Sequence, residues 1–181
     1  EKILPFGDKR SQPGTERWHS DSSFKPVPTY ASILSARIIP PTGGETVFAD
    51  LRCAWNTLSA GMQQRTGGLV VEHDIIKSRQ KGSDKNVDEG EQKRLAPAHQ
   101  ALVRPHPKNS RKALYIGTHA AQTVGWSATK SNAFLQELSD HATQFKFVCR
   151  HAWRAHDLIM WANTRAVHRR RPGISPRSPA Y

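Results

Sequence analysis

The sequence predicts a mainly β fold with a few helices, arranged as one domain over residues 1–181. Several short apolar segments bounded by Gly and Pro turns are typical of strands, whereas apolar residues recur at helical spacing in few places. A hydrophobic content of 36% is enough for one modest core in a chain of this length. Many short strands with few helices indicate an antiparallel barrel or a double-sheet jelly roll.

The first third of the chain predicts two strands and a helix. Residues 30–39 form a mostly apolar strand that ends at a Pro-Pro and Gly-Gly turn, and residues 46–49 extend again. Asp50 is the expected N-cap of a helix that continues to Gly67. Its apolar residues recur at helical spacing, which indicates core packing: Leu51, Ala54, Trp55, Leu58 and Met62.

The rest of the chain predicts one more helix among further strands. Residues 131–142 carry Phe134, Leu135 and Leu138 at helical spacing. Short apolar segments predict strands at 69–76, 101–104, 112–116, 145–150 and 157–161.

Two segments have little to bury. Residues 77–97 are rich in Lys, Asp, Glu, Gln and Gly, which predicts a mobile loop; it is either a lid or an ordinary disordered insertion. Residues 172–181 are rich in Pro and Ser, and we expect an irregular tail there because proline cannot donate to a strand ladder.

Composition restricts the partners. The net charge of +12 fits a nucleic-acid partner or small anionic ligands, and without a recognisable nucleic-acid-binding module we expect the latter. No apolar run approaches the roughly 18 residues of a membrane span and no signal peptide is visible, so we expect no membrane partner and a cytoplasmic location. Cys53 and Cys149 lack the spacing of a disulfide framework or a zinc site, and we expect buried free thiols.

The segment Trp-His-Ser-Asp at 18–21 carries the most informative chemistry. In an extended segment His19 and Asp21 point to the same face, so the two could bind one metal ion. His168 is the best candidate for a third ligand. Two histidines and one carboxylate form the facial triad of non-haem Fe(II) oxygenases. The alternative for His19 and Asp21 alone is a hydrogen-bonded pair on a surface strand.

Four motifs in order extend this pattern: WHSDSSF at 18–24, GGETVFAD at 43–50, LYIGTHA at 114–120 and HAWRAHDLIMW at 151–161. Together they resemble the TauD/TfdA family of dioxygenases, most closely the branch that acts on 2,4-dichlorophenoxyacetate. The resemblance implies a double-stranded β-helix with iron at its mouth. It also implies Fe(II), 2-oxoglutarate and O2 as cofactor and cosubstrates, with hydroxylation of an aryloxyalkanoate and release of succinate and CO2.

The resemblance assigns further roles. Thr46 matches the family's threonine that binds the far carboxylate of 2-oxoglutarate. That carboxylate also needs an arginine, and Arg177 is the nearest candidate by its separation from His168. His106 and His119 occupy places that lie near the substrate in the aryloxyalkanoate branch. Ordinary strand or loop positions remain the alternative for Thr46 and for both histidines.

Both ends depart from the family's pattern. The metal-binding motif comes only 19 residues into the chain, and residues 162–164 read Ala-Asn-Thr where the family has Asp-Asn-Arg. These departures predict a fragment with incomplete barrel closure, through truncation or a shifted reading frame at the C-terminal end.

Three hypotheses for function result. The first is a 2-oxoglutarate-dependent dioxygenase acting on an aryloxyalkanoate, and the second is a related enzyme acting on taurine or an alkyl sulfate. The third is a non-catalytic remnant of the barrel that binds a metal or an anion. The resemblance also makes a homo-oligomer an expectation.

Overall fold

The computed structural model describes residues 13–81 and 95–174, and all statements below refer to these residues. A three-stranded antiparallel sheet, in the order β11-β3-β9, forms one wall of the molecule. Its strands are β3 (Thr46–Asp50), β9 (Val148–His151) and β11 (Ala166–Arg170). Two shorter strands, β2 (Thr42–Gly43) and β12 (Gly173–Ile174), pair beyond β3 and β11 and lengthen this wall.

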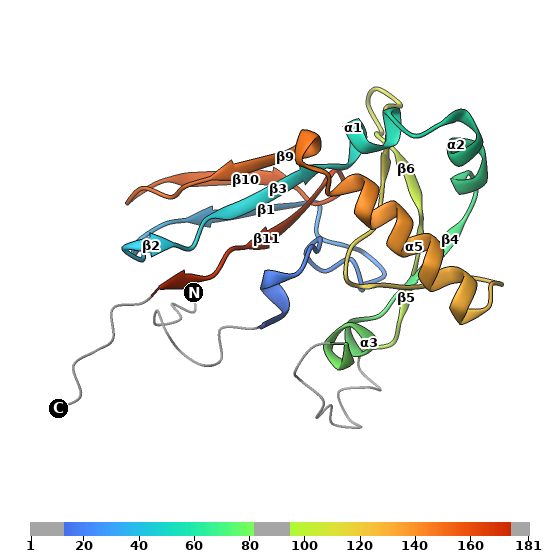
Figure 1. Ribbon diagram of the computed structural model, residues 1–181, viewed down its shortest axis with the longest axis horizontal. Helices are drawn as coiled ribbons and strands as arrows, with labels where there is room; N and C mark the ends of the chain where they lie inside the picture. The colour runs from blue at the N-terminus through green and yellow to red at the C-terminus, as the bar shows by residue number, and fades with distance from the viewer. Residues whose placement is uncertain (1–12, 82–94, 175–181) are drawn as a thin grey trace.

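A second antiparallel ribbon pairs β1 (Ala31–Ser35) with β10 (Leu158–Ala162). In Figure 1 these two strands run alongside β3, β9 and β11 on the side of the molecule away from α5. Side chains of β1, β3, β10 and β11 line one cavity, so the ribbon and the sheet form opposing walls.

The other half of the molecule contains the remaining strands and most of the helices (Figure 1). A sheet in the order β5-β4-β8 lies beside the β6-β7 hairpin. These strands are β4 (Val70–His73), β5 (Ala98–Ala101), β6 (Val103–Pro105), β7 (Lys112–Leu114) and β8 (Ala120–Thr123). The helices are η1 (Pro13–Glu16), α1 (Leu51–Asn56), α2 (Ala60–Thr66), α3 (Ile75–Gln80), α5 (Ala128–Ala142) and η2 (Phe145–Phe147).

The helix expected from Asp50 to Gly67 is two helices. Asp50 does cap the first, because its side chain accepts hydrogen bonds from the backbone N–H groups of Arg52 and Cys53. The Ser59 side chain then accepts from the N–H of Met62 and starts a second helix. Although apolar residues recur at helical spacing throughout this segment, the capping residue Ser59 divides the predicted helix into two.

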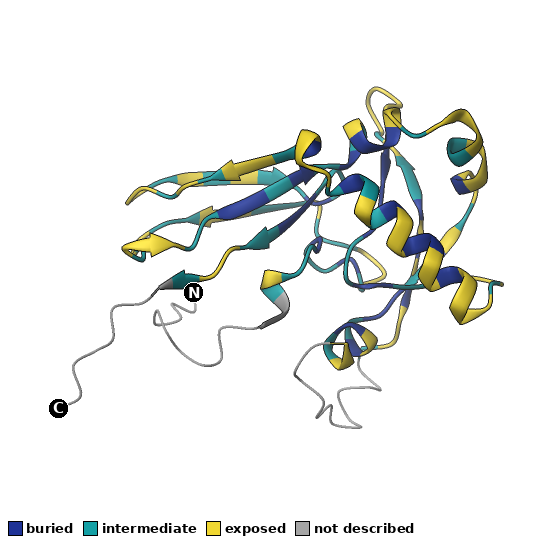
Figure 2. Ribbon diagram, viewed as in Figure 1, coloured by how far each residue is buried: buried dark blue, intermediate teal, exposed yellow. Residues whose placement is uncertain are grey.

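The core lies between α1, α5 and the strands they cover. Figure 2 shows the buried stripe of α5, to which Phe134, Leu135 and Leu138 contribute as predicted. α5 packs against β8 and α1 packs against β7. The β3 residues Val47 and Ala49 are also buried, so the β11-β3-β9 sheet packs against this core.

Several sequence-based boundaries are corrected by the structure. The strand expected at 69–76 ends at His73, since the Asp74 side chain caps α3. Residues 77–80 of the expected loop belong to α3, and residues 82–94 lie outside the described residues. In the expected tail, Gly173–Ile174 form β12, and 175–181 lie outside the described residues. The strand expected from 145 begins with the short helix η2.

The prediction of buried thiols is wrong, because Cys53 and Cys149 are both exposed. Cys53 lies on the solvent side of α1, whose buried residues are Leu51, Ala54 and Trp55, and Cys149 lies in β9, none of whose residues is fully buried. Among the described residues, no helix is long and apolar enough to cross a membrane.

Candidate metal centre

His19 and His168 are brought together by backbone pairing. They form an isolated antiparallel bridge, in which the N–H of His19 donates to the carbonyl oxygen of His168 at 3.0 Å and the reverse bond is 2.8 Å long. Ser20 adds a third link, because its hydroxyl donates to the carbonyl oxygen of Ala166, 146 residues away in sequence. The Trp-His-Ser-Asp segment is thereby attached to β11.

Asp21 completes a cluster of three potential ligands. Its Oδ1 lies 3.6 Å from Nε2 of His19 and 3.6 Å from Nε2 of His168. One ligand atom from each of the three residues lies within 4.8 Å of the others, and the two histidines are buried while Asp21 is half-buried. Two imidazole nitrogens and one carboxylate are the donor set that suits Fe(II) with open coordination positions, so these residues fit the metal that the sequence predicts.

The histidines are held in a state suited to coordination. Nδ1 of His19 lies 2.8 Å from the carbonyl oxygen of Arg17, which requires the proton on Nδ1 and leaves Nε2 free to bind a metal. Burial lowers the pKa of His168 to about 4, with a further contribution from His19 and an opposing one from Asp21. His168 therefore stays neutral near pH 7, as a metal ligand must.

A hydrogen-bonded network positions Asp21. The Ser32 hydroxyl donates to Oδ2 of Asp21 at 2.5 Å, and the side-chain amide of Asn163 donates to Ser32 at 2.8 Å. Oδ1 of Asn163 accepts from the backbone N–H of Asp21 and from the indole of Trp161. Asn163 is fully buried. With Oδ2 occupied by Ser32, Oδ1 is the oxygen that faces the two histidines.

A cavity of about 1010 Å³ opens in front of the three residues, between the β1-β10 ribbon and the sheet. Thr46 lines it, and its hydroxyl accepts a hydrogen bond from the indole of Trp153 at 3.0 Å. Arg170 lies directly opposite Thr46 in the β3-β11 register and lines the same cavity. Arg37 adds a second cationic side chain.

Sequence reasoning missed Ser32, Asn163, Trp153 and Arg170. The sequence predicts only a strand around Ser32. Asn163 lies in the segment 162–164, which departs from the family motif, so neither residue stood out as part of a site. Arg170 carried one usable signal: it lies two residues after His168, so a strand there places both side chains on one face.

The other predicted residues lie in three different situations. His119 is buried beside His19, with ring centroids 6.2 Å apart, and its Nδ1 is 3.0 Å from the hydroxyl of Ser23. His106 lies at the β6-β7 turn and lines a separate cavity, so the structure does not bring it to the cluster. Arg177 lies outside the described residues.

Comparisons with known proteins identify the family of this chain. The profile of the taurine catabolism dioxygenase TauD, TfdA family matches residues 5–179. The chain is 42% identical over 161 residues to the alpha-ketoglutarate-dependent 2,4-dichlorophenoxyacetate dioxygenase of Cupriavidus pinatubonensis, covering 88% of this chain and 56% of that protein. It is 32% identical over 165 residues to the (S)-phenoxypropionate/alpha-ketoglutarate-dioxygenase of Delftia acidovorans, covering 88% of this chain and 56% of that protein. The chain spans about half the length of the curated relatives it matches.

Solved structures extend the likeness to the fold. AAD-2, crystallised with Mn(II) and N-oxalylglycine, is 41% identical and superposes with a TM-score of 0.86 over 89% of this chain and 63% of its own. A putative alpha-ketoglutarate dependent 2,4-D dioxygenase from Burkholderia xenovorans is also 41% identical, with a TM-score of 0.87 over 89% of this chain and 62% of its own. These structures confirm the mainly β jelly-roll fold. Since the family profile matches nearly the whole chain, this protein belongs to the TauD/TfdA family of dioxygenases.

Proposed function

We propose that this protein is an Fe(II)- and 2-oxoglutarate-dependent dioxygenase that hydroxylates a small aryloxyalkanoate such as 2,4-dichlorophenoxyacetate. The observation that carries the proposal is the convergence of His19, Asp21 and His168 at the wall of a large open cavity. The names of the relatives that share 40 to 42% identity support the substrate class.

In this proposal His19, Asp21 and His168 hold the metal. Fe(II), with 2-oxoglutarate and O2, supplies the oxidising chemistry that hydroxylates a substrate C–H bond and yields succinate and CO2. The chain contributes position and charge: the hydrogen bond from Ser32 fixes the Asp21 carboxylate, and the Arg17 carbonyl orients the His19 ring.

Thr46 and Arg170 are the groups best placed to bind the far carboxylate of 2-oxoglutarate. They face each other across β3 and β11, on the same side of β11 as His168. A guanidinium with an adjacent hydroxyl provides the charge-assisted hydrogen bonds that a carboxylate favours. Arg170 also forms an exposed ion pair with Glu16 at 3.0 Å, which a cosubstrate would have to compete with. Arg177 stays a prediction, as a second candidate for the same task.

The cavity suits an anionic molecule with an apolar body. Leu34, Ile38 and Trp161 contribute apolar surface, and Arg37 contributes a positive charge. An aryl ring with a carboxylate matches these features. The assignments of His106 and His119 to substrate binding remain predictions. The absence of nucleic-acid and membrane partners, homo-oligomer formation and a cytoplasmic location also remain predictions.

Sulfonates and sulfate esters are the second candidate substrate class, because the positive charge of Arg37 would also bind a sulfonate or sulfate group. An alkylsulfatase of Acinetobacter baylyi, 28% identical over 159 residues, is among the relatives. A panel of 2,4-dichlorophenoxyacetate, (R)- and (S)-phenoxypropionates, taurine and an alkyl sulfate separates the two classes by the succinate that each one elicits.

The test of the proposed function is an anaerobic Fe(II) titration with and without 2-oxoglutarate, followed by the panel in air. We expect a visible charge-transfer band that requires 2-oxoglutarate, and substrate-dependent succinate formation. Asp21→Ala should abolish both while the far-ultraviolet circular dichroism is retained. Asp140→Ala, which removes an exposed carboxylate on α5, should leave both unchanged. A folded chain that binds Fe(II) and forms no succinate with any substrate would favour the non-catalytic remnant.

A further inference from the structure

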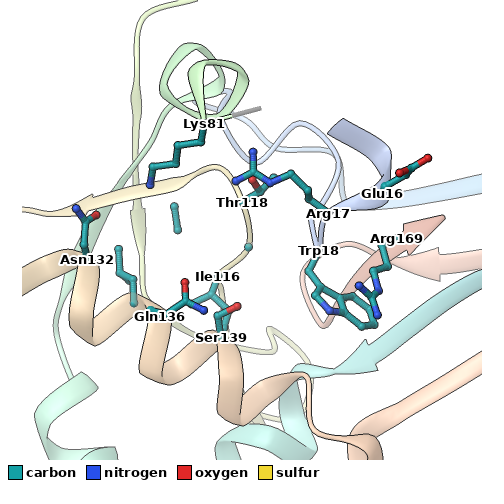
Figure 3. A pocket seen from close by; sticks show the side chains of 13 residues that line it. Glu16, Arg17, Trp18, Lys81, Ile116, Thr118, Asn132, Gln136, Ser139 and Arg169 are labelled. Carbon is teal, nitrogen blue, oxygen red and sulfur yellow. The ribbon is translucent and has the colours of Figure 1, made fainter. Parts of the chain in front are cut away.

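A second cavity lies on the opposite face of the strand pair that carries the metal cluster. Because side chains alternate along a strand, Trp18 and Arg169, which neighbour His19 and His168, point away from the metal cluster. They line a cavity of about 400 Å³, shown in Figure 3. This cavity shares no lining residue with the cavity in front of the metal cluster.

Three cationic side chains line this second cavity: Arg17, Lys81 and Arg169. The guanidinium of Arg169 lies over the Trp18 ring, 4.6 Å from its centroid, and its Nε is buried with no hydrogen-bond partner in the described part of the chain. Arg17 donates one hydrogen bond, from Nη1 to the Ser78 carbonyl oxygen at 2.9 Å. Much of the hydrogen-bonding capacity of these side chains is therefore unused.

The opposite side of the cavity presents neutral polar groups. Asn132, Gln136 and Ser139 follow one another at helical spacing on α5, and Figure 3 shows them across the cavity from Lys81 and Arg17. Gln136 also donates to Asp140 at 2.8 Å, which leaves part of its amide available. Amide and hydroxyl groups of this kind can complete the coordination of an oxyanion.

Among the described residues, the positive charges that line the cavity outnumber the carboxylates. Glu16 is the one carboxylate among the lining residues that the structure describes, and it pairs with Arg170, which belongs to the metal-side cavity. Three cations that line one partly enclosed cavity repel each other, and a buried guanidinium nitrogen without a partner costs free energy. An anion would relieve both effects.

We propose that this second cavity is a binding site for a small oxyanion with two or more negative charges, either phosphate or a dicarboxylate. Arg17, Lys81 and Arg169 supply the charge, and the α5 side chains supply neutral hydrogen bonds. The inference does not depend on the metal or on the reaction, since none of these residues is a proposed ligand of the metal or of 2-oxoglutarate.

The test is a titration of the 15N-labelled protein, followed by two-dimensional NMR, with inorganic phosphate in one arm and malonate in the other. Ionic strength is held constant with NaCl, so that general screening does not change. We expect the backbone amides of Gly117 and Thr118 and the side-chain amides of Asn132 and Gln136 to shift together with one dissociation constant. The arm with the tighter binding identifies the oxyanion class.

Two variants make the test specific. Lys81→Gln removes an exposed charge at the cavity, which avoids the folding risk of changing Arg169 in β11, and should weaken binding about three- to tenfold. Lys146→Gln, an exposed lysine on η2, should leave the affinity unchanged. Equal losses in both variants, or shifts confined to residues of the metal-side cavity, would overturn the proposal.

Discussion

Ser32 supports the candidate metal centre through two hydrogen bonds. It offers no ligand to a metal, yet its hydroxyl fixes the unused oxygen of Asp21 and connects it to the buried Asn163. The pairing of His19 with Asp21 on one face could be predicted from sequence, because a spacing of two along an extended segment is a local property. The hydrogen-bonded network of Ser32 and Asn163 could not be predicted from sequence. The two residues meet only through the pairing of β1 with β10, which no local pattern specifies.

Replacing Ser32 by alanine should weaken metal binding about 10- to 100-fold, because a ligating carboxylate that loses its outer hydrogen bond is less well oriented. Competition titrations with Mn(II) and a chelating dye would measure the dissociation constant. Ser35→Ala is the matched control. It removes a hydroxyl from the same strand and the same cavity, but this hydroxyl forms no hydrogen bond with Asp21 in the described structure. Equal affinities of the two variants would exclude Ser32 from the support of the site.

For the cosubstrate anchor, Thr46→Val and Arg170→Gln should each raise the 2-oxoglutarate concentration needed for half-maximal succinate formation, about tenfold or more for the arginine. Both should leave Mn(II) affinity unchanged. Glu16→Gln is the control, since it breaks the same ion pair as Arg170→Gln but keeps the guanidinium. If Arg170→Gln behaves like Glu16→Gln, the anchor lies elsewhere, and Arg177 becomes the next residue to replace.

At the scale of elements, capping residues decide where helices begin, and they differ in how well sequence reveals them. Asp50 directly follows a strand and is recognisable as a cap, whereas Ser59 lies among apolar residues at helical spacing, which conceal its role as a cap. β11 was also not predicted, because its sequence Ala-Val-His-Arg-Arg has too little apolar alternation to indicate a strand. Its pairing with β3 outweighs that weak local preference.

Asp50→Ala should lower the free energy of unfolding by about 1 kcal/mol, within a range of about 0.5 to 2 kcal/mol, because α1 loses its N-cap. Asp50→Asn keeps an acceptor at this position and should cost less. Urea unfolding of both variants at pH 7 gives the comparison. A loss in Asp50→Asn as large as in Asp50→Ala would attribute the effect to the ion pair with Arg52 instead.

At the scale of the whole molecule, buried histidines connect stability to pH. His73 is fully buried and stacks on Tyr115, with ring centroids 5.2 Å apart, and burial lowers its pKa to about 3. The same residue in the unfolded chain has its ordinary pKa of 6.5. Between these values the unfolded state binds a proton that the folded state does not, so stability is lost as the pH falls from 6.5 towards 3.

We expect His73 alone to contribute a slope of up to about 1.4 kcal/mol per pH unit in this interval. Urea unfolding at pH 7.0, 5.5 and 4.5 should show a smaller slope for His73→Leu than for the parent protein. Because neither ring nitrogen forms a hydrogen bond of full strength among the described residues, the leucine variant should lose little stability at pH 7. The control is His99→Gln, a change at an exposed histidine, which should keep the parent protein's slope of stability against pH. Equal slopes for His73→Leu and the parent protein would contradict the prediction.

The backbone bridge between His19 and His168 has a consequence for the order of events in folding. Closing a loop of this length costs on the order of 4 kcal/mol of chain entropy before the contacts that it permits can compensate. A growing polypeptide would hold His19 and Asp21 long before His168 has been synthesised, so at that stage it could offer a metal at most a two-ligand site. High-affinity loading should therefore report that the long-range topology is complete, which makes metal uptake a late marker of folding rather than a nucleus for it.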